Sequence, residues 1–126
     1  MNEGARQIVS QSKLSLRPYD RYGSVIPGLA WHPVSEDKKT GECTFFLRFA
    51  PGARSQPHEH VLREEFLLLE GSLVEPDGTV LRPGDFVSFP PGSRHHSHSP
   101  DGCLLLVFLR GYNRRLAPGE REDAAA

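Results

Sequence analysis

Cysteine is scarce in this sequence. Only Cys43 and Cys103 occur among its 126 residues, and they form no CxxC pair. Two isolated cysteines do not make a disulfide framework. We therefore expect both to be reduced thiols that are buried as small hydrophobic side chains.

Long hydrophobic runs are also missing. The longest, Cys103–Leu109 with the sequence CLLLVFL, is far shorter than the roughly 18 apolar residues that indicate a membrane-spanning helix. Met1–Ser12 is polar and lacks the apolar stretch and small-residue cleavage site of a signal peptide. The sequence thus predicts a cytoplasmic protein without a membrane partner.

Charge of one sign does not dominate the chain. Its 15 Lys+Arg and 16 Asp+Glu residues give a net charge of −1. Nucleic-acid-binding proteins normally carry a strong basic excess on one face. We therefore expect no nucleic-acid partner.

Glycine and proline, in contrast, are plentiful. With 12 Gly and 11 Pro in a chain the size of one domain, the composition argues against a helical bundle. Short apolar runs separated by Gly/Pro turns are typical of an all-β sandwich or barrel. The expected strands are Cys43–Ala50, Phe66–Leu69, Ser72–Val74, Thr79–Leu81, Phe86–Phe89 and Cys103–Arg110.

The domain is expected to span residues 14–116. Residues 1–13 are polar, with only Ile8 and Val9 as apolar anchors, and form either a flexible segment or a strand swapped onto a neighbouring subunit. Residues 117–126 have nothing to bury and are expected to form a flexible tail. The continuous apolarity of Cys103–Leu109 implies burial on both faces, so we expect a homodimer.

Five of the six histidines fall between positions 58 and 98. His58 and His60 are two residues apart, so an extended strand would project both side chains from one face. Glu64 shares their parity, and a Pro-Pro-Gly turn would bring His95 in from a neighbouring strand. Imidazoles combined with a carboxylate can hold a divalent ion at the mouth of a barrel. An isolated HxH pair, however, is more often simply two surface histidines.

The spacing of the two stretches together resembles the two cupin motifs. The first motif, G-x5-HxH-x3-E-x6-G, matches at Gly52, His58, His60, Glu64 and Gly71. The second, G-x5-P-x-G-x2-H-x3-N, matches at Gly84, Pro90, Gly92 and His95, with Ser99 where the family commonly has Asn. Agreement at nine of ten fixed positions is far more specific than either HxH or PxG alone.

More narrowly, LRFAPGA, HxHxxxEEFLLLEG, PPGSRH and DGCLLLVFL are similar to the ChrR-type cupin domain. That type occurs in zinc-binding anti-sigma factors, and related sequences occur among small dioxygenases that cleave diketones. The resemblance implies a small double-stranded β-helix, the jelly-roll barrel of RmlC-like cupins, which is frequently dimeric. It also implies one divalent metal ion (Zn, Fe, Mn or Ni) held by His58, His60, Glu64 and His95.

The resemblance departs from the anti-sigma factors at the N-terminus. Those proteins carry an additional helical zinc-binding region, which nothing before Leu14 matches. Anti-sigma activity is therefore not expected of this chain alone.

Several neighbouring side chains have two interpretations. Glu65 is the alternative ligand to Glu64, while His96 and His98 would lie either near the ligands or at the surface. Arg48 would bind a carboxylate substrate inside the barrel or form a surface ion pair, because both faces of its strand carry aromatics. Trp31 is expected to pack over one end of the barrel.

Two functions are compatible with such a site. The first is a metalloenzyme, with dioxygenase-like chemistry on a small carbonyl or oxoacid compound bound in the barrel. The second is a non-catalytic metal-dependent sensor or ligand-binding module, in which zinc would be structural or mark the ligand pocket. No Ser-His-Asp set or reactive-cysteine signature offers a metal-free mechanism.

Overall fold

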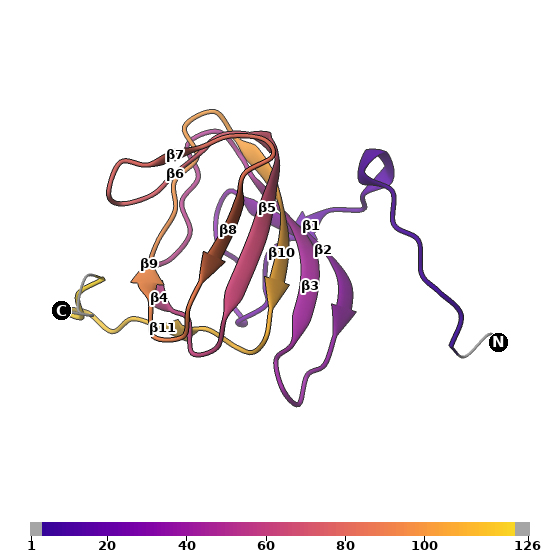
Figure 1. Cartoon of the computed structure of the whole chain (residues 1–126), viewed down its shortest axis with the longest axis horizontal. Coiled ribbons are helices and arrows are strands. Elements are labelled where there is room, and N and C mark those ends of the chain that lie inside the picture. The colour runs from indigo at the N-terminus through magenta and orange to yellow at the C-terminus, as the bar shows by residue number, and fades with distance from the viewer. Residues whose placement is uncertain (1–3, 123–126) are drawn as a thin grey trace.

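A six-stranded sheet is the scaffold of the protein. The computed structural model describes residues 4–122, which contain only β-strands apart from the 3-10 turn η1 (Gln11–Lys13). Neighbouring strands of this sheet are antiparallel, in the order β1-β2-β3-β10-β5-β8 (Figure 1). Their bounds are β1 (Arg17–Pro18), β2 (Leu29–Glu36), β3 (Cys43–Phe49), β5 (Glu64–Gly71), β8 (Phe86–Phe89) and β10 (Cys103–Leu109).

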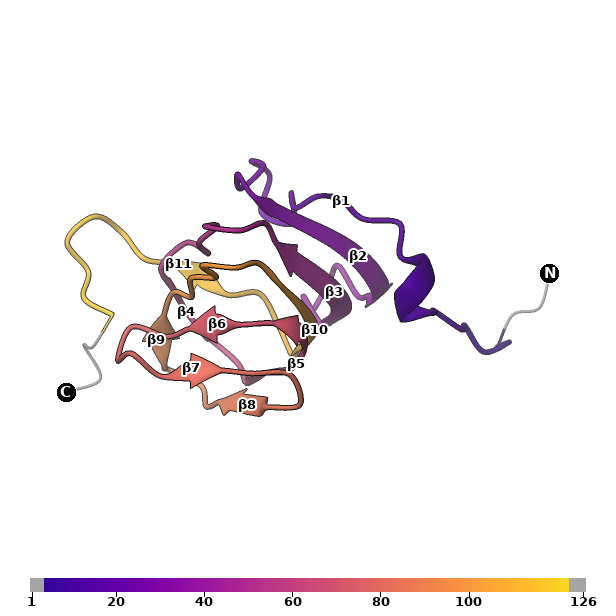
Figure 2. The same ribbon diagram turned by 90° about the horizontal axis from the view of Figure 1, so that it is seen from above.

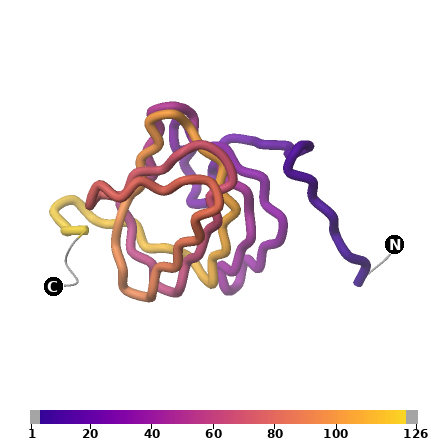
Figure 3. Tube along the Cα trace, turned by 45° about the horizontal axis from the view of Figure 1, so that its top comes forward, coloured from indigo at the N-terminus to yellow at the C-terminus, as the bar shows by residue number. Residues whose placement is uncertain are grey.

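Two smaller sheets face this scaffold. One has the strand order β11-β4-β9 and the other pairs β6 with β7. Their bounds are β4 (His58–Glu59), β6 (Leu73–Val74), β7 (Val80–Leu81), β9 (Arg94–His95) and β11 (Arg114–Arg115). These short strands lie across from the large sheet in Figure 2, and the chain trace in Figure 3 runs as a ring. The predicted all-β jelly-roll barrel is confirmed.

The inner face of the large sheet carries the hydrophobic core. In β3 the buried side chains alternate at Phe45, Leu47 and Phe49, because successive residues of a strand point to opposite faces. β10 continues the core with alternate buried residues, including Leu105 and Val107. Each such side chain contributes about 1.5–3 kcal/mol on burial.

Arg48 lies on the outer face of the large sheet, so of its two interpretations the surface ion pair is the correct one. Its side chain projects away from the core and forms an ion pair with Glu70, 3.5 Å away. Glu65 also lies on this face and pairs with Arg110 at 3.1 Å. Neither residue is therefore available inside the barrel.

Several strands differ from the sequence-based expectation. β2 was not predicted, because Pro33 interrupts its pattern, and the register of β2 against β3 shifts at this point. Proline lacks an amide hydrogen, which confines it to edges and bulges of sheets. Trp31 of β2 lies within the core, edge-on to Tyr19 and Phe45.

The two ends of the described chain behave differently. Residues 4–10 run away from the barrel, as all three overall views show (Figures 1–3), whereas Gln11 of η1 donates a hydrogen bond to Glu70 at 2.9 Å. The C-terminal segment instead contacts the small sheet, where Glu120 pairs with Arg114 and Arg94, and Glu122 pairs with His96. Residues 1–3 of the predicted N-terminal segment and 123–126 of the predicted tail lie outside the described residues.

Two further expectations concern thiols and membranes. Cys43 and Cys103 are free and buried, as predicted. Within residues 4–122, no helix has the length and apolarity needed to cross a membrane.

Candidate metal centre

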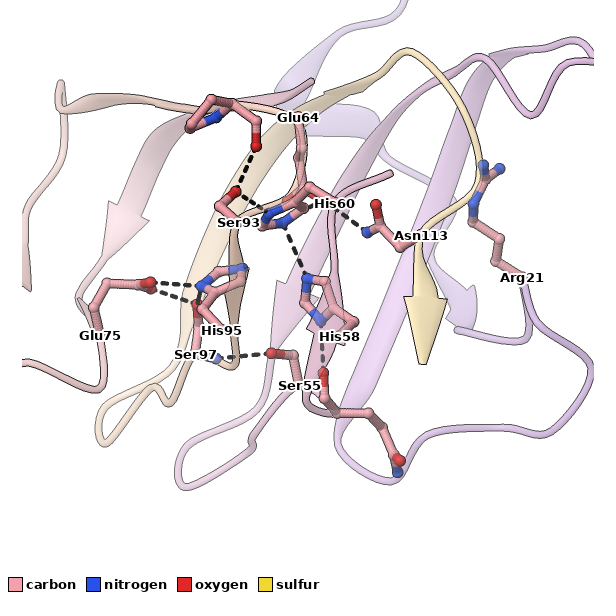
Figure 4. A network of polar contacts seen from close by, with 12 residues as sticks. Arg21, Ser55, His58, His60, Glu64, Glu75, Ser93, His95, Ser97 and Asn113 are labelled. Carbon is pink, nitrogen blue, oxygen red and sulfur yellow. Dashed lines mark hydrogen bonds and ion pairs between the residues drawn. The ribbon is translucent and has the colours of Figure 1, made fainter. Parts of the chain in front are cut away.

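Four potential ligand side chains converge at one end of the barrel. They are His58, His60, Glu64 and His95, and one donor atom from each lies within 4.8 Å of the others (Figure 4). The structure thus brings together all four residues that the cupin resemblance implied.

Strand pairing explains how the histidines meet. β4 and β9 are antiparallel, and His58 lies directly opposite His95. The chain around His60 is fixed by two backbone hydrogen bonds, in which its N–H donates to Ser93 and its carbonyl accepts from Gly92. Opposed residues on one face of an antiparallel pair have Cβ atoms only about 4.5–5.5 Å apart.

Glu64 reaches the cluster by a route that strand parity did not describe. We expected His58, His60 and Glu64 to follow one regular strand, but β4 ends at Glu59 and a bend separates it from β5. Glu64 is the first residue of β5, where it is buried together with Phe66 and Leu68 on the inner face. Parity therefore holds within β5 and not across the bend.

Each histidine ring is oriented by a hydrogen bond at Nδ1. His58 Nδ1–H donates to the Gln56 carbonyl at 2.6 Å, and His95 Nδ1–H donates to Glu75 Oε1 at 2.6 Å. His60 Nδ1 is 2.9 Å from Ser93 Oγ, whose hydroxyl hydrogen is donated to Pro90. These acceptors place the proton on Nδ1, which leaves Nε2 of each ring as a lone-pair donor.

The Nε2 atoms point toward a common centre. His58 Nε2 is 3.2 Å from His60 Nε2, which is 3.3 Å from Glu64 Oε1. His95 Nε2 is buried and has no hydrogen-bond partner within residues 4–122. A buried imidazole lone pair without a proton donor is costly unless it binds something. The residues present therefore fit a divalent metal ion.

Electrostatics favour the protonation states that a metal requires. Burial lowers the pKa of His58 to about 4, which outweighs the attraction of Glu64 for the protonated ring. Burial opposes ionisation of Glu64, but its close contact with His60, the electrostatic effect of His58 and the hydrogen bond donated by Asn113 lower its pKa to about 2. The site thus combines a neutral imidazole with an anionic carboxylate near neutral pH.

A second layer of residues was not predicted from the sequence. Asn113 Nδ2 donates to Glu64 Oε1 at 2.9 Å, and Ser97 Oγ donates to Glu75 Oε2 at 2.5 Å. Ser97 follows His95 by two residues, so alternation would have placed both on one face. Glu75 and Asn113 carry no comparable signal, because they lie far along the chain from the residues they contact.

The remaining histidines and Ser99 lie outside the cluster. His96 Nδ1 is 2.6 Å from Glu122 Oε1. His98 links strands through its backbone, which exchanges two hydrogen bonds with Val74. Ser99, at the position where cupins commonly have Asn, is buried and donates to the Ser72 carbonyl at 2.6 Å.

A cavity of about 500 Å³ lies beside the four donors. Its wall includes the ligand candidates His58, Glu64 and His95, and most of the rest is apolar. The apolar wall includes Leu29, Phe45, Leu47, Phe66, Leu105 and Val107. Cavities of this size and character commonly hold small organic ligands.

Comparisons with known proteins agree with this architecture. A proposed acetylacetone dioxygenase from Methylibium petroleiphilum PM1 has a TM-score of 0.79 at 15% identity, over 97% of this chain and 88% of that one. An RmlC-like cupin from Ralstonia eutropha JMP134 has a TM-score of 0.76 at 15% identity, over 94% of this chain and 76% of that one. A polyketide cyclase from Streptomyces resistomycificus has a TM-score of 0.66 at 21% identity, over 94% and 89%.

At these identities the structural similarity shows the cupin fold alone. None of the curated proteins matches the chain. The family match is more specific, because the ChrR cupin-like domain matches residues 17–113, which include all four candidate ligands. The chain therefore belongs to the ChrR cupin-like domain family.

Proposed function

We propose that this protein is a metal-dependent enzyme with dioxygenase-like chemistry on a small carbonyl or oxoacid compound. The observation that carries the proposal is the convergence of three imidazoles and a carboxylate beside an apolar cavity. Such a donor set suits Fe(II), Mn(II), Ni(II) or Zn(II). Bound iron would supply Lewis acidity and one-electron chemistry with dioxygen.

The chain's own residues would prepare the site. His58, His60, Glu64 and His95 would hold the ion, while the Nδ1 hydrogen bonds fix the ring orientations. Phe89 packs against His60 and His95, with ring centroids 4.7 and 4.3 Å apart, and helps to exclude water.

Tyr19 would contribute a hydrogen-bond donor to the bound compound. Its side chain lines the cavity, and burial is the main cause that raises its pKa well above the usual value for tyrosine. The phenol therefore stays protonated at neutral pH and can donate to a substrate oxygen.

Oxygen uptake after metal reconstitution tests this proposal. We would determine the metal content of freshly purified protein, remove the metal, and reload the protein anaerobically with Fe(II). Oxygen consumption with acetylacetone or phenylpyruvate in the parent, and its loss in a His58→Ala/His60→Ala variant, is the expected result. Equal metal content in parent and variant after dialysis would refute the assigned ligands.

A non-catalytic module is the second candidate function. The observation that favours it is the match to the ChrR cupin-like domain, a type known from zinc-binding regulators. In that case the protein would retain zinc tightly and would show no turnover with a broad panel of carbonyl compounds. Stoichiometric iron-dependent oxygen uptake would reject this alternative.

We also propose that the protein acts as a homodimer formed through the outer face of the large sheet. Phe86 on this face is 56% exposed, and it lines a shallow groove together with Thr44 and Phe108. The N-terminal arm carries Ile8, which is 75% exposed and has little apolar contact within its own chain. A second copy would cover both features.

A further inference from the structure

Arg115 is a cation on the wall of the cavity, and no acidic partner for it lies within residues 4–122. It lies opposite His58 in the pairing of β11 with β4, and opposed residues of an antiparallel pair share a face of the sheet. Its guanidinium donates to the side-chain oxygen of Gln56. No carboxylate within residues 4–122 lies within ion-pair distance of it, whereas the adjacent Arg114 pairs with both Glu59 and Glu120.

The cavity is larger than a simple diketone requires, and most of its wall is apolar. A cavity of roughly 150 Å³ lined by apolar side chains accommodates benzene. The cavity here measures about 500 Å³, and its apolar wall extends along β3 and β10. A ligand that fills it must have a bulky apolar body.

The charges around the cavity also favour an anion. Among the four donors, only Glu64 carries a negative charge when the ligating imidazoles are neutral. Together with the Glu75 carboxylate behind His95, it would balance a bound divalent ion, which leaves the positive charge of Arg115 at the cavity wall.

We infer that the ligand of this site is an oxoacid with a bulky apolar body, whose carboxylate pairs with Arg115 while the body lies in the barrel. The inference rests on the proposed function only in placing the ligand beside the metal centre. A guanidinium matches the geometry of a carboxylate through two parallel hydrogen bonds. Gln56, which already accepts from Arg115, holds the guanidinium at the wall.

Binding to the redox-silent Zn(II)-loaded protein tests this assignment without any need for turnover. Three probes separate the contributions: phenylpyruvate, its neutral methyl ester, and pyruvate, which lacks the apolar body. Isothermal titration calorimetry should show that phenylpyruvate binds about fivefold more tightly than the ester. It should bind about tenfold more tightly than pyruvate.

Two variants should distinguish the contribution of the ligand's carboxylate to binding from that of its apolar body. Arg115→Gln should remove the preference for phenylpyruvate over its ester, because the positive charge is lost while a polar side chain is kept. Leu105→Trp, which fills the barrel, should weaken acid and ester alike by about fivefold. Arg63→Gln is the matched control, since it removes the same charge from an exposed residue that contacts Ser88.

The inference is overturned if phenylpyruvate shows no saturable binding to the parent. An undiminished preference for the acid in Arg115→Gln, with Arg63→Gln behaving identically, also overturns it. Circular dichroism shows whether Leu105→Trp folds. If this variant does not fold, Arg115→Gln alone decides the test. Selective phenylpyruvate binding without oxygen uptake by the Fe(II) protein would reject the dioxygenase and retain the ligand class, so the two failures are distinguishable.

Discussion

Each histidine of the candidate centre is oriented by a hydrogen bond at Nδ1, the ring nitrogen that points away from the centre. His95 is the most strongly supported, because Glu75 accepts its Nδ1 proton at 2.6 Å while Ser97 holds the other carboxylate oxygen. A carboxylate behind a ligating imidazole fixes the ring and raises the basicity of its free nitrogen. Glu75 is therefore expected to act on metal affinity without binding the metal.

Replacement of Glu75 by alanine should weaken metal binding by about 10- to 100-fold. Competition with a chromophoric chelator measures this affinity for Zn(II). Glu75→Gln should restore part of the loss, because its amide oxygen can still accept from His95. Glu70→Ala is the control, since Glu70 lies on the outer face and pairs with Arg48. An unchanged zinc affinity in Glu75→Ala would contradict the role of Glu75.

The stability of the metal-free protein should fall as the pH is lowered from 6.5. The pKa of His58 is about 4 in the folded state, below its usual 6.5, so only the unfolded chain gains this proton in that window. The free energy of unfolding should therefore decrease by up to roughly 1.4 kcal/mol for each pH unit between these values. Urea denaturation at several pH values, with chelator present, measures this dependence.

His58→Asn should flatten the pH dependence between 6.5 and about 4. The folded pKa of Glu64, at about 2, is also below its usual value of 4.5, so its contribution is lost only at more acid pH. A pH slope that is identical in parent and His58→Asn would contradict the burial argument.

Sequence patterns could identify the ligand candidates but not the residues behind them. The ligand candidates have fixed spacings in the sequence because each occupies a defined position next to a turn or at the end of a strand. They are His58, His60, Glu64 and His95. Glu75 is 20 residues from His95 in the chain and meets it only after the barrel has closed. A contact of this kind leaves no periodic signal.

At the scale of elements, the sequence predicted β3, β5, β8 and β10 and also the short β6 and β7, but it did not predict the long β2 or the two-residue strands β1, β4, β9 and β11. β3, β8 and β10 have strong apolar patterns and were predicted with ends within one residue of those observed. β4, β9 and β11 have two residues each, too few to show any periodicity. β4 and β9 nevertheless carry two of the four ligand candidates, His58 and His95, and only motif spacing indicates these residues.

Gly71, at the end of β5, is required by a close approach of the backbone. Its φ is +81°, and a Cβ atom there would lie 2.0 Å from the Gly102 carbonyl oxygen. Gly71→Ala should therefore lower the free energy of unfolding by about 3 kcal/mol or more, from backbone strain and displacement of the neighbouring turn. Thermal and urea denaturation provide the measurement.

Gly78→Ala is a matched control for that substitution. Gly78 also has a positive φ, of +87°, but nothing lies within 4 Å of its Cβ position. Gly78→Ala should lower the free energy of unfolding only through the strained backbone conformation, by about 1 kcal/mol. Equal losses in the two variants would show that the close contact at Gly71 has no energetic effect.

At the scale of the whole molecule, the proposed homodimer can be tested at Phe86. Phe86→Glu would bury an unpaired charge in the proposed interface, which is strongly unfavourable. We expect the dimer dissociation constant to rise by at least about tenfold, measured by light scattering coupled to size-exclusion chromatography. Val80→Glu is the control, because Val80 is 44% exposed on β7 of a small sheet.

The position of β10 in the large sheet determines when this protein can fold. β10 lies between β3 and β5, although it is the penultimate strand within residues 4–122. A growing chain on the ribosome therefore holds two unjoined halves of its main sheet until Cys103–Leu109 has been synthesised. Asn113, which supports Glu64, emerges later still. The ligand residues are thus translated well before the site that they form can close around an ion.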